Sequence, residues 1–179
     1  YDPETKVWGK YNPDGTFTQG TPHDLSKPSV GFYGHSCSIS ADGQTALVSG
    51  HASASSGGAW IWQYDPETKV WGKYNPDGTF TPNTQHDLSK TSGANGNYGM
   101  CCSISADGQT ALVSGYASTS GGGAYIWQYD PETKVWGKYN PDGTFTPNTQ
   151  HDLSKTSGAN GNYGMCCSIS ADGQTALVS

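Results

Sequence analysis

Cysteine is the residue type in this chain with the most reactive side chain, and it occurs in a repeating pattern. A single Cys37 is followed by two adjacent pairs, Cys101–Cys102 and Cys166–Cys167. Neighbouring residues on a β-strand point to opposite faces, so the two members of a pair are expected to face different neighbours. The pattern predicts disulfides between successive repeats, from Cys37 to Cys101, from Cys102 to Cys166, and from Cys167 to a following unit.

A second interpretation of the cysteines stays open, in which Cys102-type residues are small buried apolar groups and Cys101-type residues are free thiols. The first copy has Ser36 in place of the first cysteine, and we expect this position to face the preceding unit. No second ligand pair follows at the spacing of a zinc site, so neither a metal nor another cofactor is expected. Disulfides would imply an oxidising setting, which favours an extracellular or cell-surface location.

A second candidate for chemistry is the segment HDLSK, in which His86, Asp87 and Ser89 are the residue types of a hydrolase triad. Catalytic triads assemble from distant parts of a chain, whereas these residues are contiguous and recur in every copy. We therefore expect a local helical turn, with Asp152 as the cap in the last copy, and no enzymatic activity.

Aromatic side chains are the third candidate, since the chain has 6 Trp and 11 Tyr. Rings of this kind stack on sugars, and carbohydrate is therefore a candidate partner. The same rings are also expected to fill the core between sheets. The main candidates for ligand stacking are Trp60, Trp62, Tyr125 and Trp127, and Trp71 and Trp136 are further ones.

These residues are positioned by an internal repeat. Residues 64–114 and 129–179 are identical over 51 positions, and residues 1–49 form a third copy that is two residues shorter. The repeats are therefore assigned to residues 1–63, which start within a unit, 64–128, and 129–179, which are incomplete. We expect the natural chain to be longer, with about 14 further residues completing the last unit by analogy with the internal copies.

Each unit reads as short strands joined by tight turns. Alternation and the Asp-Gly and Asp-Pro turns favour hairpins, and helical periodicity is not sustained anywhere. We predict an all-β fold of tandem four-stranded antiparallel meanders, similar to propeller blades, completed by further copies or assembled into an array. In the second unit the expected strands are Met100–Ser105, Gln109–Gly115, Ala124–Tyr129 and Lys134–Tyr139.

The unit resembles the FG-GAP repeat of integrin-alpha-like β-propellers. The residues that carry the resemblance are Gly99, Ser103, Ser105, Asp107, Gly108, Gly115, Gly123, Ala124, Tyr125 and Trp136, and again Gly34, Ser38, Ser40, Asp42, Gly43, Gly50, Gly58, Ala59, Trp60 and Trp71. The resemblance implies a propeller-type fold that serves adhesion, ligand display or scaffolding. Members of that family often carry calcium loops rich in Asp, but this chain has one Asp per turn, Asp107 or Asp142, so no calcium is expected.

Composition excludes two classes of partner. The chain has 9 Lys, no Arg, a formal net charge of −6 and a pI near 5.1, so no nucleic acid is expected. No apolar run reaches the ~18 residues of a membrane span.

Two functions follow from the repetition. The first is a structural or interaction protein, a tandem-repeat β-scaffold that binds copies of itself in an extracellular filament or surface assembly. The alternative is a lectin-like or adhesion β-propeller that binds a ligand and is completed by oligomerisation. An enzyme needs one unique site, and identical units do not provide one.

Overall fold

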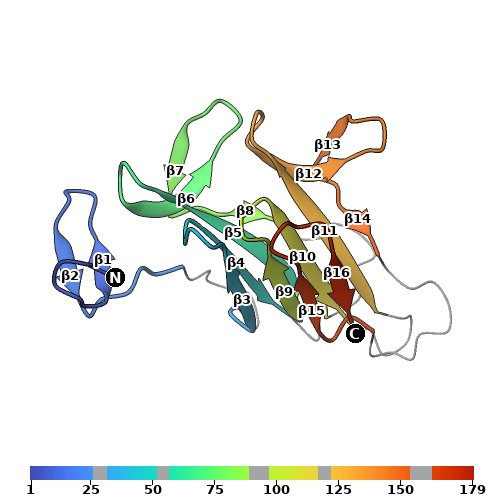
Figure 1. Ribbon diagram of the computed structural model, residues 1–179, viewed down its shortest axis with the longest axis horizontal. Helices are drawn as coiled ribbons and strands as arrows, with labels where there is room; N and C mark the ends of the chain where they lie inside the picture. The colour runs from blue at the N-terminus through green and yellow to red at the C-terminus, as the bar shows by residue number, and fades with distance from the viewer. Residues whose placement is uncertain (26–31, 52–56, 89–96, 117–121, 154–162) are drawn as a thin grey trace.

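The computed structural model describes residues 1–25, 32–51, 57–88, 97–116, 122–153 and 163–179. Their regular structure consists of strands alone, arranged in four antiparallel sheets, none of which closes on itself. Figure 1 shows that the two large sheets and the last hairpin follow one another closely, while the first hairpin lies apart. The all-β, antiparallel character expected from the sequence is therefore confirmed, but each large sheet has six strands and not the expected four, because the chain after the fourth strand adds two short ones.

The two large sheets have the same strand order. The first sheet consists of β3 (Ser36–Ile39), β4 (Thr45–Gly50), β5 (Gly58–Asp65), β6 (Val70–Tyr74), β7 (Phe80–Pro82) and β8 (His86–Asp87). The second sheet consists of β9 (Cys101–Ile104), β10 (Thr110–Gly115), β11 (Gly123–Asp130), β12 (Val135–Tyr139), β13 (Phe145–Pro147) and β14 (His151–Asp152). The N-terminal hairpin is β1 (Gly9–Tyr11) with β2 (Phe17–Gln19), and the C-terminal hairpin is β15 (Cys167–Ile169) with β16 (Ala176–Val178).

The described part of the HDLSK segment is extended: Asp152, expected to cap a helical turn, lies in a strand instead, and the rest of that expected turn lies outside the described residues. His151 and Asp152 form β14 and pair with Ile126 and Tyr125 of β11. The reason is the length of β11: β12 pairs only with its end, from Gln128 onward. The earlier part of that edge would otherwise have unpaired backbone groups, and β14 covers it.

The Asp-Pro-Glu-Thr turn is held by its own aspartate. The Asp65 carboxylate accepts hydrogen bonds from the backbone N–H of Thr68 at 3.2 Å and from the Tyr74 hydroxyl at 3.0 Å. Burial opposes ionisation of Asp65, but these bonds outweigh it and lower the pKa of the carboxyl. Asp130 repeats the contact with Tyr139 at 3.1 Å, so the turn and the strand that follows it form one local unit.

The main core lies between the first and second sheets. Leu47 and Ile61 of the first sheet pack with Ile104, Val113 and Trp127 of the second. A smaller core joins Leu112 of the second sheet to Cys167 of the C-terminal hairpin. Each sheet therefore buries its apolar side chains against the next one, which supplies the cover that a single meander lacks.

The first strands of the first sheet, the second sheet and the C-terminal hairpin are β3, β9 and β15, and we call them the leading strands. Each leading strand makes the same contacts with the next one. The backbone N–H groups of Cys102 and Ile104 donate to the hydroxyl oxygens of Ser36 and Ser38, each at 3.2 Å. Alternate N–H groups of an edge strand point away from its sheet, and an unpaired row of them attracts other strands. Here side chains of the preceding sheet satisfy that row.

The step from the second sheet to the C-terminal hairpin reproduces this pattern. Cys167 N–H donates to the Cys101 sulfur at 3.1 Å, and Ile169 N–H donates to the Ser103 hydroxyl at 3.2 Å. All four bonds join residues 66 positions apart. The interface between successive units is thus one arrangement used twice.

Gly99 allows a close approach between the first and second sheets and offers a test of this packing. It has a φ of +88°, and a Cβ there would lie 2.4 Å from the Gly58 carbonyl oxygen. Gly34 is the equivalent residue, with a φ of +83° and nothing within 4 Å of a Cβ. We expect Gly99→Ala to lower the free energy of unfolding by about 2 kcal/mol more than Gly34→Ala, because only Gly99→Ala adds a clash to the backbone cost.

Urea denaturation of the two variants measures this difference. Equal losses of stability in both would contradict close packing of the sheets at Gly99.

Candidate functional site

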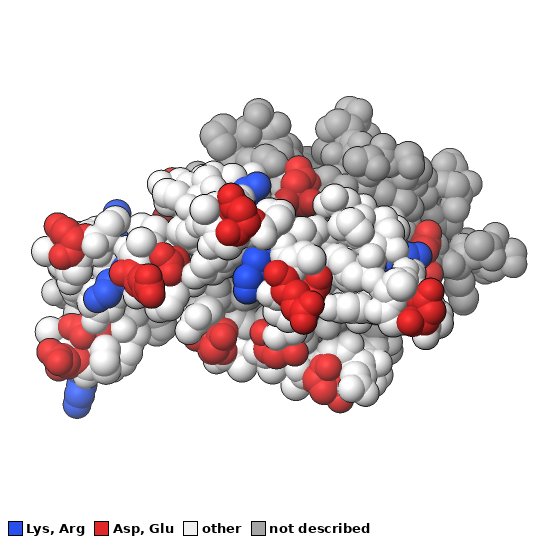
Figure 2. Space-filling view, turned by 90° about the horizontal axis from the view of Figure 1, so that it is seen from above, with Lys and Arg blue, Asp and Glu red and all other residues white. Residues whose placement is uncertain are grey.

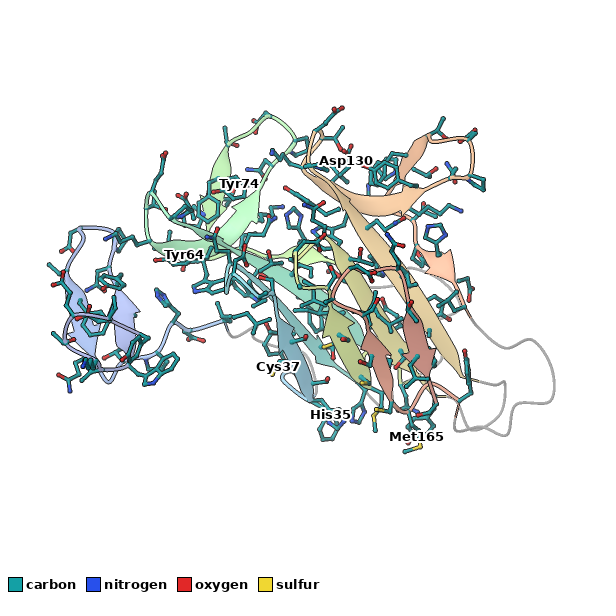
Figure 3. The ribbon with its side chains drawn as sticks, viewed as in Figure 1. His35, Cys37, Tyr64, Tyr74, Asp130 and Met165 are labelled. Carbon is teal, nitrogen blue, oxygen red and sulfur yellow. The ribbon has the colours of Figure 1, made fainter. Side chains whose placement is uncertain are left out.

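The five cysteines lie on the leading strands or directly before them, and all are free thiols. Figure 3 shows sulfur atoms along the lower edge of the molecule, where Cys37 and Met165 are labelled. Cys37 and Cys166 are exposed, Cys101 is half-buried, and Cys102 and Cys167 are buried. These five thiols form the first candidate site.

Cys102 faces the preceding sheet. Its sulfur lies 3.5 Å from the Ser36 hydroxyl and 3.9 Å from the Leu47 carbonyl oxygen. Burial raises the pKa of this thiol to about 11, so it stays protonated near neutral pH. Cys102 therefore has the character of a small apolar core residue.

Cys101 faces the following unit and contacts Cys167. Its sulfur accepts the Cys167 N–H at 3.1 Å and lies 3.4 Å from the Cys167 carbonyl oxygen. Hydrogen bonds from the Cys167 thiol and backbone lower the pKa of Cys101. The same thiol contact, together with burial, raises the pKa of Cys167. The pair thus has one sulfur that favours the thiolate and one that favours the thiol.

This geometry corrects one expectation about the first copy. Ser36 does not face the preceding unit; it faces the following one, where its hydroxyl meets Cys102. The reason is an offset between stacked strands, which sequence alternation alone does not give. Cys101 and Cys167, assigned to different bonds from the sequence, are the cysteines in contact, and the disulfide chain itself stays a prediction.

The four main candidate stacking aromatics lie in the core. Trp60, Trp62, Tyr125 and Trp127 are all buried. Trp62 donates its indole N–H to the Tyr33 hydroxyl at 3.0 Å, and the Tyr125 ring lies 5.5 Å from that of Tyr98. Their ring faces are packed against protein, so these four residues do not offer a platform for sugar in this structure.

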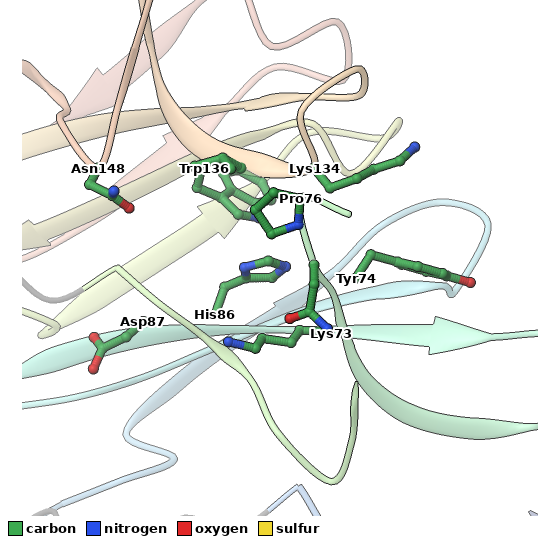
Figure 4. Close-up of a pocket in the computed structure, with 10 residues that line it drawn as sticks. Lys73, Tyr74, Pro76, His86, Asp87, Lys134, Trp136 and Asn148 are labelled. Atoms are coloured by element: carbon green, nitrogen blue, oxygen red, sulfur yellow. The ribbon is translucent and has the colours of Figure 1, made fainter. Parts of the chain in front are cut away.

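A pocket between the first and second sheets is a second candidate site, and the sequence did not indicate it. Its volume is about 330 Å³. Figure 4 shows the His86 ring near Trp136 and Pro76, with Lys73 and Asp87 on the same side. The first sheet supplies one part of the wall, from β8 and from the end of β6 and the turn that follows it. The second sheet supplies the rest, from the start of β12 and from Asn148 after β13. The sequence singled out Trp136, His86 and Asp87 separately but did not indicate that they line one cavity.

Trp136 lines this pocket and has an unpaired hydrogen-bond donor. Its side chain is buried, and its indole N–H has no hydrogen-bond partner within the part of the chain that the structure describes. Buried indole N–H groups are usually paired. Of the suggested triad, His86 and Asp87 line the pocket, while Ser89 lies outside the described residues.

His86 makes the stability of the chain depend on pH. Its Nε2 lies 2.9 Å from the Gln63 side-chain oxygen, and burial, with a smaller effect of Lys73, lowers its pKa to about 4. The unfolded chain therefore takes up a proton below about pH 6.5 that the folded chain does not hold until pH 4. We expect this residue to cost roughly 2–3 kcal/mol of stability between pH 7 and pH 4.5.

Urea titrations of wild type and His86→Gln at both pH values isolate this effect from that of the carboxylates. The variant should show a smaller fall in stability over that interval. If the fall is the same in both proteins, His86 is not held neutral in the folded state.

The charge on the molecule is dispersed. Figure 2 shows Asp and Glu side chains scattered over one face, with few Lys among them.

Across the described ranges no group of three or more His, Cys, Asp or Glu side chains is arranged to hold a metal ion. No helix in those ranges is long and apolar enough to cross a membrane. The absence of a nucleic-acid partner stays a prediction.

The chain was compared with family models, curated proteins and solved structures. None of the three comparisons found a match. The function of this protein therefore has to be argued from its own geometry.

Proposed function

We propose that this protein is a structural or interaction protein, a tandem-repeat β-scaffold whose copies associate head to tail. The observation that carries the proposal is the interface between successive units, which occurs twice within the chain with the same contacts. The first sheet and the C-terminal hairpin offer the two complementary halves of a third such interface.

The exposure of equivalent leucines supports this proposal. Leu47 and Leu112 are 0% exposed, because each packs against the third strand of its own sheet and against the unit that follows. Leu177, at the same position of the two-stranded C-terminal hairpin, is 70% exposed. Burying such a side chain contributes roughly 1.5–3 kcal/mol. Leu177 is therefore an apolar group whose equivalents are covered by the following unit.

The opposite face shows the same relation at an isoleucine. Ile104 packs against the preceding sheet and is 7% exposed, while Ile39, its equivalent in the first sheet, is 58% exposed. A second copy that places its C-terminal hairpin against β3 would cover Ile39 and Leu177 together. In this arrangement the Ser168 hydroxyl of the second copy would accept a hydrogen bond from the Ile39 N–H of the first, as the Ser103 hydroxyl accepts one from the Ile169 N–H within the chain.

In an interface between two unlike faces, each copy uses one face and keeps the other available for a further copy. Each added copy leaves one face of each kind open, so association of this type continues into an open array or closes into a ring. This behaviour suits a filament or surface assembly, and we propose an extracellular setting for it. We include in this proposal that the repeats are FG-GAP-like and propeller-blade-like, and that further copies complete the propeller or array.

Sedimentation of the purified chain over a range of concentrations tests this function. We expect a mass above 18.9 kDa that grows with concentration. A single species of 18.9 kDa at all concentrations would contradict the proposal.

The pocket supports a second candidate function, a lectin-like ligand-binding module. The Trp136 and His86 rings and the polar side chains of Asp87 and Asn148 line one cavity. Indole and imidazole rings flanked by polar groups are suited to a carbohydrate. If the cavity binds sugar, Asn148→Gly removes a polar side chain of its wall while keeping a residue suited to the φ of +55° there, and we expect about tenfold weaker binding.

A glycan panel followed by calorimetry measures this binding, with Asn83→Gly, at the equivalent position of the first sheet, as the matched control. Absence of binding to every glycan, or equal affinity in wild type and Asn148→Gly, would contradict the lectin-like function.

A further inference from the structure

We propose that Cys101 and Cys167 form an oxidisable thiol pair that reacts with low-molecular-weight disulfides and links the second sheet to the C-terminal hairpin. The proposal concerns a link within one chain and goes beyond the scaffold function. It assigns a chemical role to two of the five thiols and excludes the others from it.

The Cys101 side chain is in contact with Cys167. Its sulfur lies 3.1 Å from the Cys167 nitrogen and 3.4 Å from the Cys167 carbonyl oxygen. This contact joins two successive units through residues 66 positions apart. A disulfide needs such a close approach of one cysteine to the other before it can form without a shift of the backbone.

The two cysteines differ in exposure and in acidity. Cys101 is half-buried and receives an N–H on its sulfur, so it can ionise and still be reached by a small reagent. The thiolate is the form that attacks a disulfide. Cys167 is buried beside it, and its contact with Cys101 is the main cause that raises its pKa. Once Cys101 has entered a mixed disulfide, that cause is gone, and Cys167 can lose its proton and attack in turn.

The reaction balances as two exchanges. The Cys101 thiolate attacks one sulfur of the small disulfide, forms a mixed disulfide and releases one small thiolate. Cys167 then attacks the Cys101 sulfur, forms the Cys101–Cys167 bond and releases the second small thiolate. The proton of Cys167 passes to that leaving thiolate. The protein is oxidised by two electrons, and the small disulfide is reduced to two thiols.

The other three thiols are separated from this pair by position. Cys102 lies on the opposite face of β9 and contacts Ser36, which has no thiol. Cys37 belongs to the first sheet and is exposed. Cys166 also contributes to lowering the pKa of Cys101, but it is exposed and precedes β15, so it is the competitor that the experiment must remove.

The experiment uses the full chain with Cys37→Ser and Cys166→Ser, which removes both exposed thiols. After incubation with oxidised glutathione, we expect two of the three remaining thiols to be lost, a mass decrease of about 2 Da and a linked pair of tryptic peptides. The same chain with Cys101→Ser in addition should show no linked peptides, and Cys102→Ser should leave the link intact.

Three results would overturn the proposal. One is that all three thiols remain after oxidation of the folded chain. The others are a linked peptide that persists in the Cys101→Ser chain, and a link that forms only between separate chains. Because the expected link lies within one chain and is independent of protein concentration, its failure is distinguishable from a failure of head-to-tail association.

Discussion

Leu177→Asp is expected to convert the associated chain into a monomer of 18.9 kDa. Leu177 takes the position at which Leu47 and Leu112 are covered by the following unit. A carboxylate there would have to leave water without a partner in an apolar interface, which costs several kcal/mol. At 70% exposure the residue supports little of the monomer's own core, so the fold should remain intact.

Sedimentation and far-ultraviolet circular dichroism together measure this outcome. Trp8→Asp is the matched control, because Trp8 is 75% exposed but lies in the N-terminal hairpin region, away from the leading strands. The control should associate like the wild type. Association that survives Leu177→Asp would place the contact between copies elsewhere.

Mild oxidation is expected to join separate chains through Cys166 of one copy and Cys37 of the next. Cys166 is the equivalent of Cys101 in the last repeat, and Cys37 is the equivalent of Cys167 in the first. If two copies associate as successive units do, Cys166 of one copy therefore contacts Cys37 of the next, as Cys101 contacts Cys167. Both thiols are exposed in the single chain, so they are available to react. Non-reducing electrophoresis should then show a ladder of multiples of 18.9 kDa that dithiothreitol removes.

Single serine substitutions test this junction, which depends on the head-to-tail proposal. Cys166→Ser and Cys37→Ser should each abolish the ladder, whereas Cys102→Ser should leave it unchanged. If the ladder persists without Cys37, the partner of Cys166 in the assembly has been misidentified.

The strands of this protein were predictable because local chemistry determines them. The Asp107-Gly108 turn and the alternation of Cys102 and Ile104 predicted β9 and β10 with close to their observed bounds. Repetition also predicted that each unit needs cover from another. These signals lie within about ten residues of one another, where a sequence pattern is informative.

The contacts between units were not predictable in the same way. The side that Ser36 faces depends on how two strands 66 residues apart are offset, and the pairing of His151 depends on where β12 leaves β11. The pocket at Trp136 arises where two sheets meet. Each is set by tertiary packing, for which the sequence of one unit contains no direct signal.

Mixing two interface variants tests head-to-tail association most directly. Ile39→Asp disables the face that receives a preceding copy, and Leu177→Asp disables the face that receives a following copy, so each variant alone should be a monomer. An equimolar mixture still has one intact face of each kind, so it should form a dimer of one chain of each variant and nothing larger. Sedimentation of the mixture at the monomer mass, or formation of larger assemblies, would contradict the head-to-tail interface.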